Sequence, residues 1–188
     1  LHEQAVDGVV IIIESHIIDT AEVALPDGVP MVVIDSTGTT QHPAIDTDQA
    51  DGARQATQHL LDLGHETVWH VAGPESSYSA ARRLAAWQAT LEAAGRPVPP
   101  VFHGGWSAES GYRAGLVIAG RPDITAVFAA NDQTALGVLR AAHELGRAVP
   151  ETLSVVGFDD SPESDSFWPP LTTVHQSFDE VGRRAVTN

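Results

Sequence analysis

Short apolar runs alternate along the chain with longer segments in which apolar residues recur at helical spacing. The short runs predict strands at 8–13, 30–34, 67–72, 125–130 and 153–158, with a weaker strand at 101–103. The longer segments predict helices at 49–63, 79–94, 108–119 and 132–145. Within the second of these, Leu84, Trp87, Leu91 and Ala94 repeat at helical spacing. Alternating strands and helices with short connections predict a parallel, doubly wound α/β sheet.

Two further features of the pattern support this fold. The runs VVIII and MVVI are apolar throughout, which is typical of parallel strands covered on both faces. A glycine follows each predicted helix, and we expect it to end that helix in the left-handed conformation. These glycines are Gly64, Gly95, Gly120 and Gly146.

Polar or aromatic side chains follow nearly every predicted strand. They are Asp35, Ser77, Ser79, Trp106, Asn131, Asp132, Asp159 and Asp160. Arg83 lies in the first turns of the helix after Ser79. Because ligands of open parallel sheets bind beyond the carboxyl ends of the strands, these side chains predict a binding site at that edge.

The chemistry of this set favours a neutral, hydroxyl-rich ligand. Aspartate accepts hydrogen bonds from hydroxyls, asparagine and glutamine donate and accept, and arginine donates in a fixed fork. The face of a tryptophan can cover the apolar side of a sugar ring. Any single Asp or Asn after a strand could instead cap a helix or form a turn, and position by position this alternative stays open.

Composition and charge exclude several other classes of protein. The chain has 188 residues, no cysteine and a formal net charge of -15. Disulfide frameworks and thiolate chemistry are therefore absent, and binding of this part to DNA or to an anionic membrane is disfavoured. The longest apolar run, at 9–13, is far shorter than the ~20 residues that cross a bilayer. No signal peptide is visible in the sequence, which begins at Leu1.

Metal binding and catalysis are not predicted. His65, Glu66 and His70 lack the spacing of a zinc helix, and the acidic cluster near Asp51 lacks the spacing of a calcium loop. The adjacent Asp159 and Asp160 could act as paired acid and base, but neighbouring side chains diverge and no poised nucleophile accompanies them. We therefore expect neither a metal nor a cofactor nor catalytic residues.

Several motifs carry a resemblance to a known family. They are AVFAANDQTALGVLRAAHELG, SVVGFDDSPES, PPLTTVHQSFDEVG, HLLDLGHETVWHVAGPESSYSAARRLAAW and GGWSAESGY. They resemble the lactose/galactose repressor family of bacterial transcription regulators. The resemblance implies a periplasmic-binding-protein-like fold of type I, with two doubly wound α/β lobes and three crossovers. It assigns 1–47 and 177–188 to a lobe near DNA, incomplete in this chain, and 48–176 to a distal lobe.

The resemblance also implies which residues contact an effector. They are Asp35, Ser77, Ser79, Arg83, Trp106, Asn131, Asp159, Gln176 and Phe178. It implies the effector-binding and dimerisation core of a cytoplasmic repressor, a dimer or tetramer that responds to a sugar such as a galactoside, bound between the lobes. Operator DNA would be bound by an N-terminal helix-turn-helix outside this chain. The alternatives are a secreted sugar-binding protein of a transport system and a sugar hydrolase on an α/β scaffold.

Overall fold

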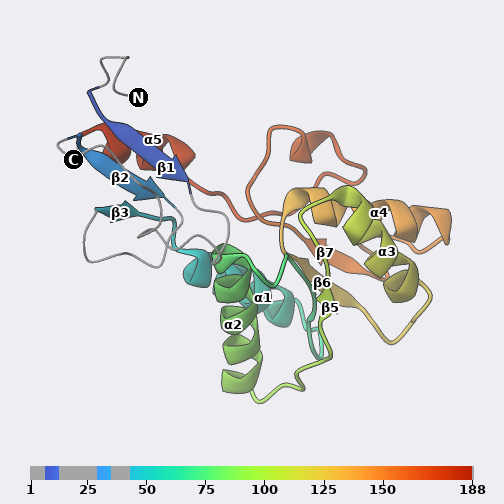
Figure 1. Cartoon of the computed structure of the whole chain (residues 1–188). Coiled ribbons are helices and arrows are strands. Elements are labelled where there is room, and N and C mark those ends of the chain that lie inside the picture. The colour runs from blue at the N-terminus through green and yellow to red at the C-terminus, as the bar shows by residue number, and fades with distance from the viewer. Residues whose placement is uncertain (1–6, 13–28, 35–42, 188) are drawn as a thin grey trace. The chain divides into compact units, whose positions relative to one another are not determined.

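The computed structural model describes residues 7–12, 29–34 and 43–187 (Figure 1). The chain divides into two compact units. The first unit comprises Leu1–Asp48, Ser76–Ser79 and Ser177–Asn188, and the second comprises Gln49–Glu75 and Ala80–Gln176. Two of these divisions lie within one residue of the crossovers implied by the family resemblance. Which unit lies nearer to DNA remains a prediction.

The second unit is built on a four-stranded parallel sheet with the strand order β5-β4-β6-β7. Its strands are β4 (Trp69–Ala72), β5 (Phe102–His103), β6 (Ala126–Ala129) and β7 (Ser154–Val156). Each lies inside a predicted strand and is shorter than it. From β4 the chain turns to one side to form β5, and β6 and β7 then follow on the other side. The predicted doubly wound parallel sheet is thus confirmed.

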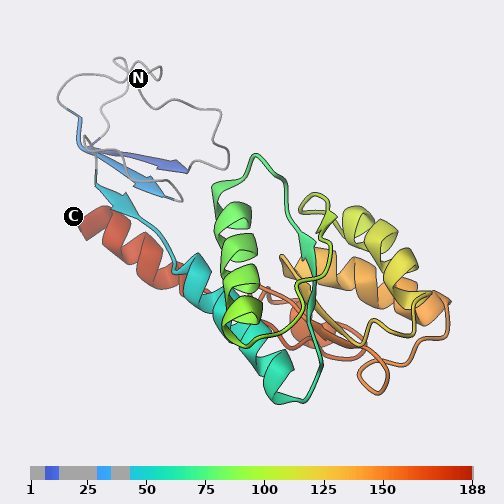
Figure 2. The same ribbon diagram turned by 90° about the horizontal axis from the view of Figure 1, so that it is seen from below.

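Helices cover both faces of this sheet (Figures 1 and 2). Their bounds are α1 (Gln49–Asp62), α2 (Tyr78–Ala93), α3 (Ala108–Ala119) and α4 (Asp132–Glu144). On one face, Leu60 of α1 and Trp87 of α2 pack with Phe128 in a buried apolar cluster. On the other face, Ile118 and Val138 pack with Val127. Adjacent residues of β6 thus face opposite cores, which explains why this strand is apolar throughout.

Glycines permit the close packing of α3 against α4. A Cβ atom built on Gly137 would stand 2.0 Å from the carbonyl oxygen of Ala108, so no larger residue fits there. The glycines after the helices behave as predicted at three positions, since Gly64, Gly95 and Gly146 have positive φ. The prediction for Gly120 is wrong: its φ is -75°. Gly120 instead keeps right-handed helical backbone angles at the end of α3.

After β7 the chain passes through a short 3-10 helix, η1 (Ser164–Ser166), and returns along the edge of the sheet. The return segment, residues 171–176, makes isolated parallel bridges to the β7 side of the sheet. Gly157 donates its backbone N–H to Thr172 O at 2.8 Å, and Asp159 donates to Val174 O at 2.9 Å. This pairing brings the return segment beside the loop that carries Asp159.

The first unit contains a second parallel sheet, formed by β1 (Val9–Ile12), β2 (Met31–Ile34) and β3 (Ala44–Ile45) in that order. Helix α5 (Phe178–Thr187) packs against β2 and β3. Neither β3 nor α5 was predicted. Coverage on both faces is confirmed in β2, where Val32 and Val33 are buried. The same prediction is wrong for β1, where Val10 is 47% and Ile12 is 70% exposed. No helix in the described ranges covers that face of β1.

No helix within the described ranges combines the length and apolarity needed to cross a lipid bilayer.

Candidate functional site

The candidate site lies at the carboxyl edge of the four-stranded sheet in the second unit. The loops after β4 and β6 diverge there, because β5 and β7 lie on opposite sides of the central pair. A crevice at such a switch point is the usual ligand position in open α/β sheets. Ala130 immediately follows β6, and Asp159 follows β7 after two further residues.

Arg83 is the centre of the site. It comes from the second turn of α2 and is only 4% exposed. Its Nε donates to Gln49 Oε1 at 2.8 Å, its Nη1 donates to the carbonyl oxygen of Ala130, and its Nη2 lies 3.4 Å from Asp159 Oδ1. A buried guanidinium is costly unless it is paired and hydrogen-bonded in this way.

Aromatic rings complete the surroundings of this guanidinium. Its central carbon lies 3.8 Å from the ring centroid of Phe158 and 5.4 Å from that of Trp106. Stacking on an aromatic face stabilises a desolvated cation by about 2 kcal/mol. The guanidinium of Arg83 is therefore oriented by polar partners and by two aromatic rings.

Asp159 supplies the negative charge. Its backbone φ is 114°, a value that residues other than glycine rarely adopt. Its carboxylate accepts a hydrogen bond from Gln176 Nε2 at 2.6 Å. Burial raises the pKa of Asp159, while the charge of Arg83 and the Gln176 hydrogen bond act in the opposite direction. Strained backbone of this kind is concentrated at functional sites, where the surrounding structure maintains it.

Gln49 connects these groups and was not predicted. It is the first residue of α1, it is buried, and its Nε2 donates to Gln176 Oε1 at 3.2 Å. No sequence signal marks it, because its partners lie 34 and 127 residues away along the chain.

Trp106 and Asn131 form another wall of the site. A Cβ atom at Gly73 would lie 2.6 Å from the Trp106 ring. The absence of a side chain at Gly73 therefore allows the indole to pack against the end of β4. Asn131 caps α4 through its Oδ1, which accepts from Thr134 N at 2.9 Å, and its Nδ2 donates to Trp106 O at 3.1 Å. Helix capping, the alternative left open for these positions, is thus the observed role of Asn131, and Asn131 also supports the Trp106 loop.

The other predicted site residues fall outside this group. Ser77 and Ser79 belong to the first unit, are buried, and share a hydrogen bond of 3.0 Å between their hydroxyls. Phe178 begins α5, also in the first unit, and is 57% exposed. Asp35 lies outside the described residues. The structure therefore brings together Arg83, Trp106, Asn131, Asp159 and Gln176.

The two remaining acids after the strands have local partners. Asp132 accepts hydrogen bonds from Ser161 N at 2.7 Å and from the hydroxyl of Thr173, and so orders the loop after β7. Asp160 lies 2.8 Å from His175 Nδ1. Asp159 and Asp160 therefore diverge, as the sequence predicts. In the described part of the chain, no group of three or more His, Asp and Glu side chains could hold a metal ion.

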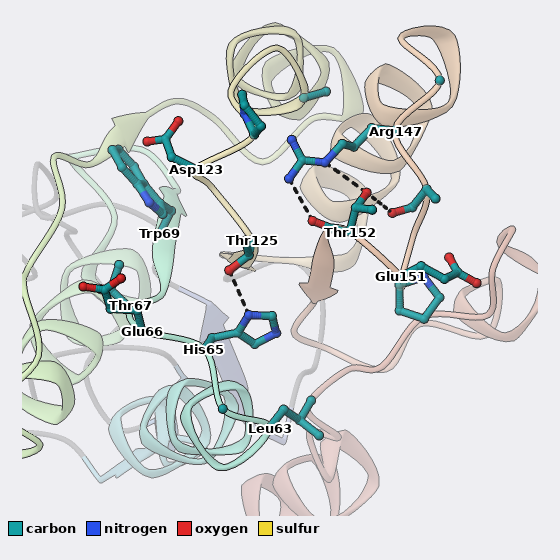
Figure 3. Close-up of a pocket in the computed structure, with 16 residues that line it drawn as sticks. Leu63, His65, Glu66, Thr67, Trp69, Asp123, Thr125, Arg147, Glu151 and Thr152 are labelled. Atoms are coloured by element: carbon teal, nitrogen blue, oxygen red, sulfur yellow. Dashed lines mark hydrogen bonds between the residues drawn. The ribbon is translucent and has the colours of Figure 1, made fainter.

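A hollow of about 970 Å³ lies at the opposite, amino-terminal edge of the same sheet (Figure 3). Several of its polar groups are hydrogen-bonded to other parts of the protein. The two ring nitrogens of His65 lie 2.9 Å from Thr125 Oγ1 and 3.0 Å from Ser154 Oγ, and Arg147 donates to Ile124 O at 2.6 Å and to Thr152 O at 2.8 Å. These bonds join the loops between helices and strands, so we assign the hollow a structural role.

Comparison with known proteins identifies the family. The profile of the periplasmic binding protein-like domain family matches residues 57–188. The lactose operon repressor of Klebsiella pneumoniae is 44% identical over 140 residues, which is 74% of this chain and 40% of that protein. The lactose operon repressor of Escherichia coli K12 is 38% identical over 161 residues, which is 84% of this chain and 44% of that protein. The chain thus spans less than half the length of these two relatives.

Solved structures agree with this assignment. The lac repressor dimer bound to operator and the anti-inducer ONPF has a TM-score of 0.85 and 36% identity, over 96% of this chain and 64% of that chain. The complex of the transcriptional regulator CelR with cellobiose has a TM-score of 0.81 and 34% identity, over 96% of this chain and 57% of that chain. The chain therefore belongs to the periplasmic binding protein-like domain family, and within it to the lactose/galactose repressors that its motifs resemble.

Proposed function

We propose that this chain is the effector-binding and dimerising core of a sugar-responsive transcriptional repressor. The observation that carries the proposal is the ion pair between the buried Arg83 and the partly buried Asp159 at the carboxyl edge of the sheet, in a chain of the repressor family. The pair presents a fixed donor and a fixed acceptor, which is the arrangement that recognises neighbouring hydroxyls of a sugar.

We propose as sugar contacts all nine residues predicted from the sequence. Asp159 accepts from ring hydroxyls, Arg83 and Gln176 donate to them, and Trp106 covers an apolar ring face. Asn131 shapes the wall by holding the Trp106 loop in place. Asp35, Ser77, Ser79 and Phe178 are proposed contacts by family resemblance alone. Such a site rejects a sugar lacking one of these hydroxyls, because a buried polar group would then lose its partner.

Regulation would follow from conformational preference. A ligand shifts the equilibrium between two conformations only by the difference in its affinity for them. Couplings of about 1–3 kcal/mol are usual, and reversal of a population from 1:99 to 99:1 requires about 5.5 kcal/mol. Operator DNA would be bound by an N-terminal domain, as part of a dimer or tetramer in the cytoplasm. The lac repressor structure bound to operator, itself a dimer, supports this assembly.

We propose that the chain is not an enzyme. Asp159 is engaged by Gln176 and Arg83, while the adjacent Asp160 is directed to His175, so the two carboxylates do not share one reaction centre. Its relatives are transcriptional repressors, which favours regulation over hydrolysis and over transport. A monomer that binds sugar with no effect on DNA binding would favour the transport protein instead.

Binding calorimetry tests the proposal. The panel comprises lactose, galactose, cellobiose and glucose, and we expect at least one of them to bind. Arg83→Met should weaken that binding about 10- to 100-fold, because it removes a charge-assisted donor worth about 1.5–3 kcal/mol.

The matched control is Arg113→Met. Arg113 is an exposed arginine of α3 whose partner is Glu109, so its loss should leave the affinity unchanged. A panel without any binding sugar, or equal affinities in the parent and Arg83→Met, would refute the site.

A further inference from the structure

Four side chains in the second unit form a closed ring of polar contacts. Arg83 Nε donates to Gln49 Oε1 at 2.8 Å, and Gln49 Nε2 donates to Gln176 Oε1 at 3.2 Å. Gln176 Nε2 then donates to Asp159 Oδ1 at 2.6 Å. The ring closes where that same oxygen lies 3.4 Å from Arg83 Nη2. Only Arg83 and Asp159 in this ring carry charge.

The direction of the hydrogen bonds around the ring is fixed by chemistry. An arginine can only donate and an ionised carboxylate can only accept, so each intervening amide must present its oxygen toward Arg83 and its nitrogen toward Asp159. Hydrogen bonds in such a chain polarise one another. Removal of one amide therefore weakens the bond that the other amide makes.

The two glutamines lie at the two ends of the second unit. Gln49 is the first residue of the second unit and Gln176 is its last. Their side chains are bonded directly to each other and, at the two ends of the amide pair, to the proposed sugar-binding charges. A sugar hydroxyl that replaces a contact of Arg83 or Asp159 thus alters bonds at two chain connections between the units.

We propose that Gln49 is a positioning residue of the effector site. It holds Arg83 and Gln176 in their ligand-binding orientation and links that site to the Asp48–Gln49 and Gln176–Ser177 connections. The part that concerns the ligand rests on the proposed function, whereas the ring itself is testable in the free protein.

Two variants and one control test this role. Gln49→Met keeps the length of the side chain and removes the two hydrogen bonds that Gln49 makes within the ring. Gln49→Glu keeps an acceptor for Arg83 but removes the donor, so the Gln176 amide must turn over and present its oxygen to Asp159. The control, Thr57→Val, removes a fully buried hydroxyl of the same helix that donates to Ala53 O at 2.8 Å, outside the ring. All three variants should be somewhat less stable than the parent.

The first measurement is the pKa of Asp159 in the free protein, from the carbon chemical shift of its carboxyl group. The groups that act on this carboxyl are Arg83 from α2, the Gln176 amide and Asp132 at the start of α4. Gln49→Met should raise the pKa of Asp159, Gln49→Glu should raise it further, and Thr57→Val should leave it unchanged. An Asp159 pKa that is the same in the parent and in both Gln49 variants would overturn the inference.

The second measurement is calorimetry with the same four sugars. Gln49→Met should weaken binding about ten-fold, as is typical of mutations in coupled networks, and Gln49→Glu at least as much. Thr57→Val should bind like the parent. Equal affinities in Gln49→Met and Thr57→Val would overturn the effector role. If the Asp159 pKa responds but the parent binds none of the sugars, the ring stands, while the proposed function and the effector role both fail.

Discussion

Replacement of Arg83 by methionine gives the sharpest test of the electrostatics of this protein in the absence of any ligand. Methionine retains an unbranched apolar side chain that can still pack against Phe158. It removes the ion pair with Asp159 and the hydrogen bonds to Gln49 and to the carbonyl oxygen of Ala130. The effect on the free energy of unfolding therefore combines the loss of the charge with the loss of these hydrogen bonds, and only the charge makes it depend on pH.

The expected magnitude follows from the burial of the pair. Breaking a buried ion pair by removing one partner costs about 3–5 kcal/mol, because the other charge is left uncompensated. The side chain of Asp159 is 30% exposed, so water stabilises part of its remaining charge. We expect Arg83→Met to lower the free energy of unfolding by about 2–3 kcal/mol at neutral pH.

The loss should depend on pH in a defined direction. The pKa of Asp159 is already raised in the folded protein by burial, and loss of the Arg83 charge raises it further. The folded state then retains its proton to higher pH than the unfolded state, so the free energy of unfolding falls as pH rises through the folded pKa. Near pH 4, about the ordinary pKa of an aspartic acid, Asp159 is protonated and most of its contribution to the loss disappears.

Urea unfolding followed by circular dichroism, at about pH 4 and about pH 7.5, measures this difference. The double variant Arg83→Met/Asp159→Asn should be less pH-dependent than Arg83→Met and should recover about 1 kcal/mol at neutral pH. A loss of equal size at both pH values, together with additive effects in the double variant, would refute the pairing of Arg83 with Asp159.

Two further changes test the core of the second unit. Burial lowers the pKa of His70 to about 4, so its neutral ring stabilises the fold fully above its ordinary value of 6.5, and this stability is lost as pH falls toward 4. His70→Phe should remove up to about 3 kcal/mol of the pH-dependent change in the free energy of unfolding, measured with urea. An unchanged dependence of that free energy on pH would contradict the lowered pKa of His70. Gly137→Ala should lower the free energy of unfolding by about 1–3 kcal/mol, because the new methyl group would meet Ala108 O. Gly182→Ala, with nothing within 4 Å of its added Cβ, serves as the control, and equal melting temperatures for the two variants would exclude this clash.

Much of the fold could be predicted because apolar periodicity is a local signal. Helix α3 has the predicted bounds, and α1, α2 and α4 differ from theirs by one residue at one or both ends. Strand β3 has only two residues, too few for a periodic pattern. Helix α5 carries two local signals that the prediction missed. Phe178, Val181 and Ala185 repeat at helical spacing, and Ser177 and Glu180 have the spacing of a capping box that would have indicated its start.

The candidate site was predictable in its position but not in its connections. The carboxyl ends of parallel strands must meet at one edge, so Trp106, Asn131 and Asp159 could be grouped without coordinates. Which of them caps a helix and which remains available to a ligand depends on side-chain direction, which the sequence does not determine. Gln49 was missed because a hydrogen bond across 127 residues leaves no trace in local spacing.

The pairing of the return segment, residues 171–176, with the β7 side of the sheet has a consequence for solubility during folding. An outer strand with unsatisfied backbone groups can recruit a strand from another molecule and start aggregation. Here the bonds from Gly157 and Asp159 to residues 172 and 174 occupy part of that border. In a folding intermediate in which this segment has not yet docked, the edge strand β7 would be exposed to pairing with other molecules. Truncation of the chain before residue 171 should therefore favour aggregation.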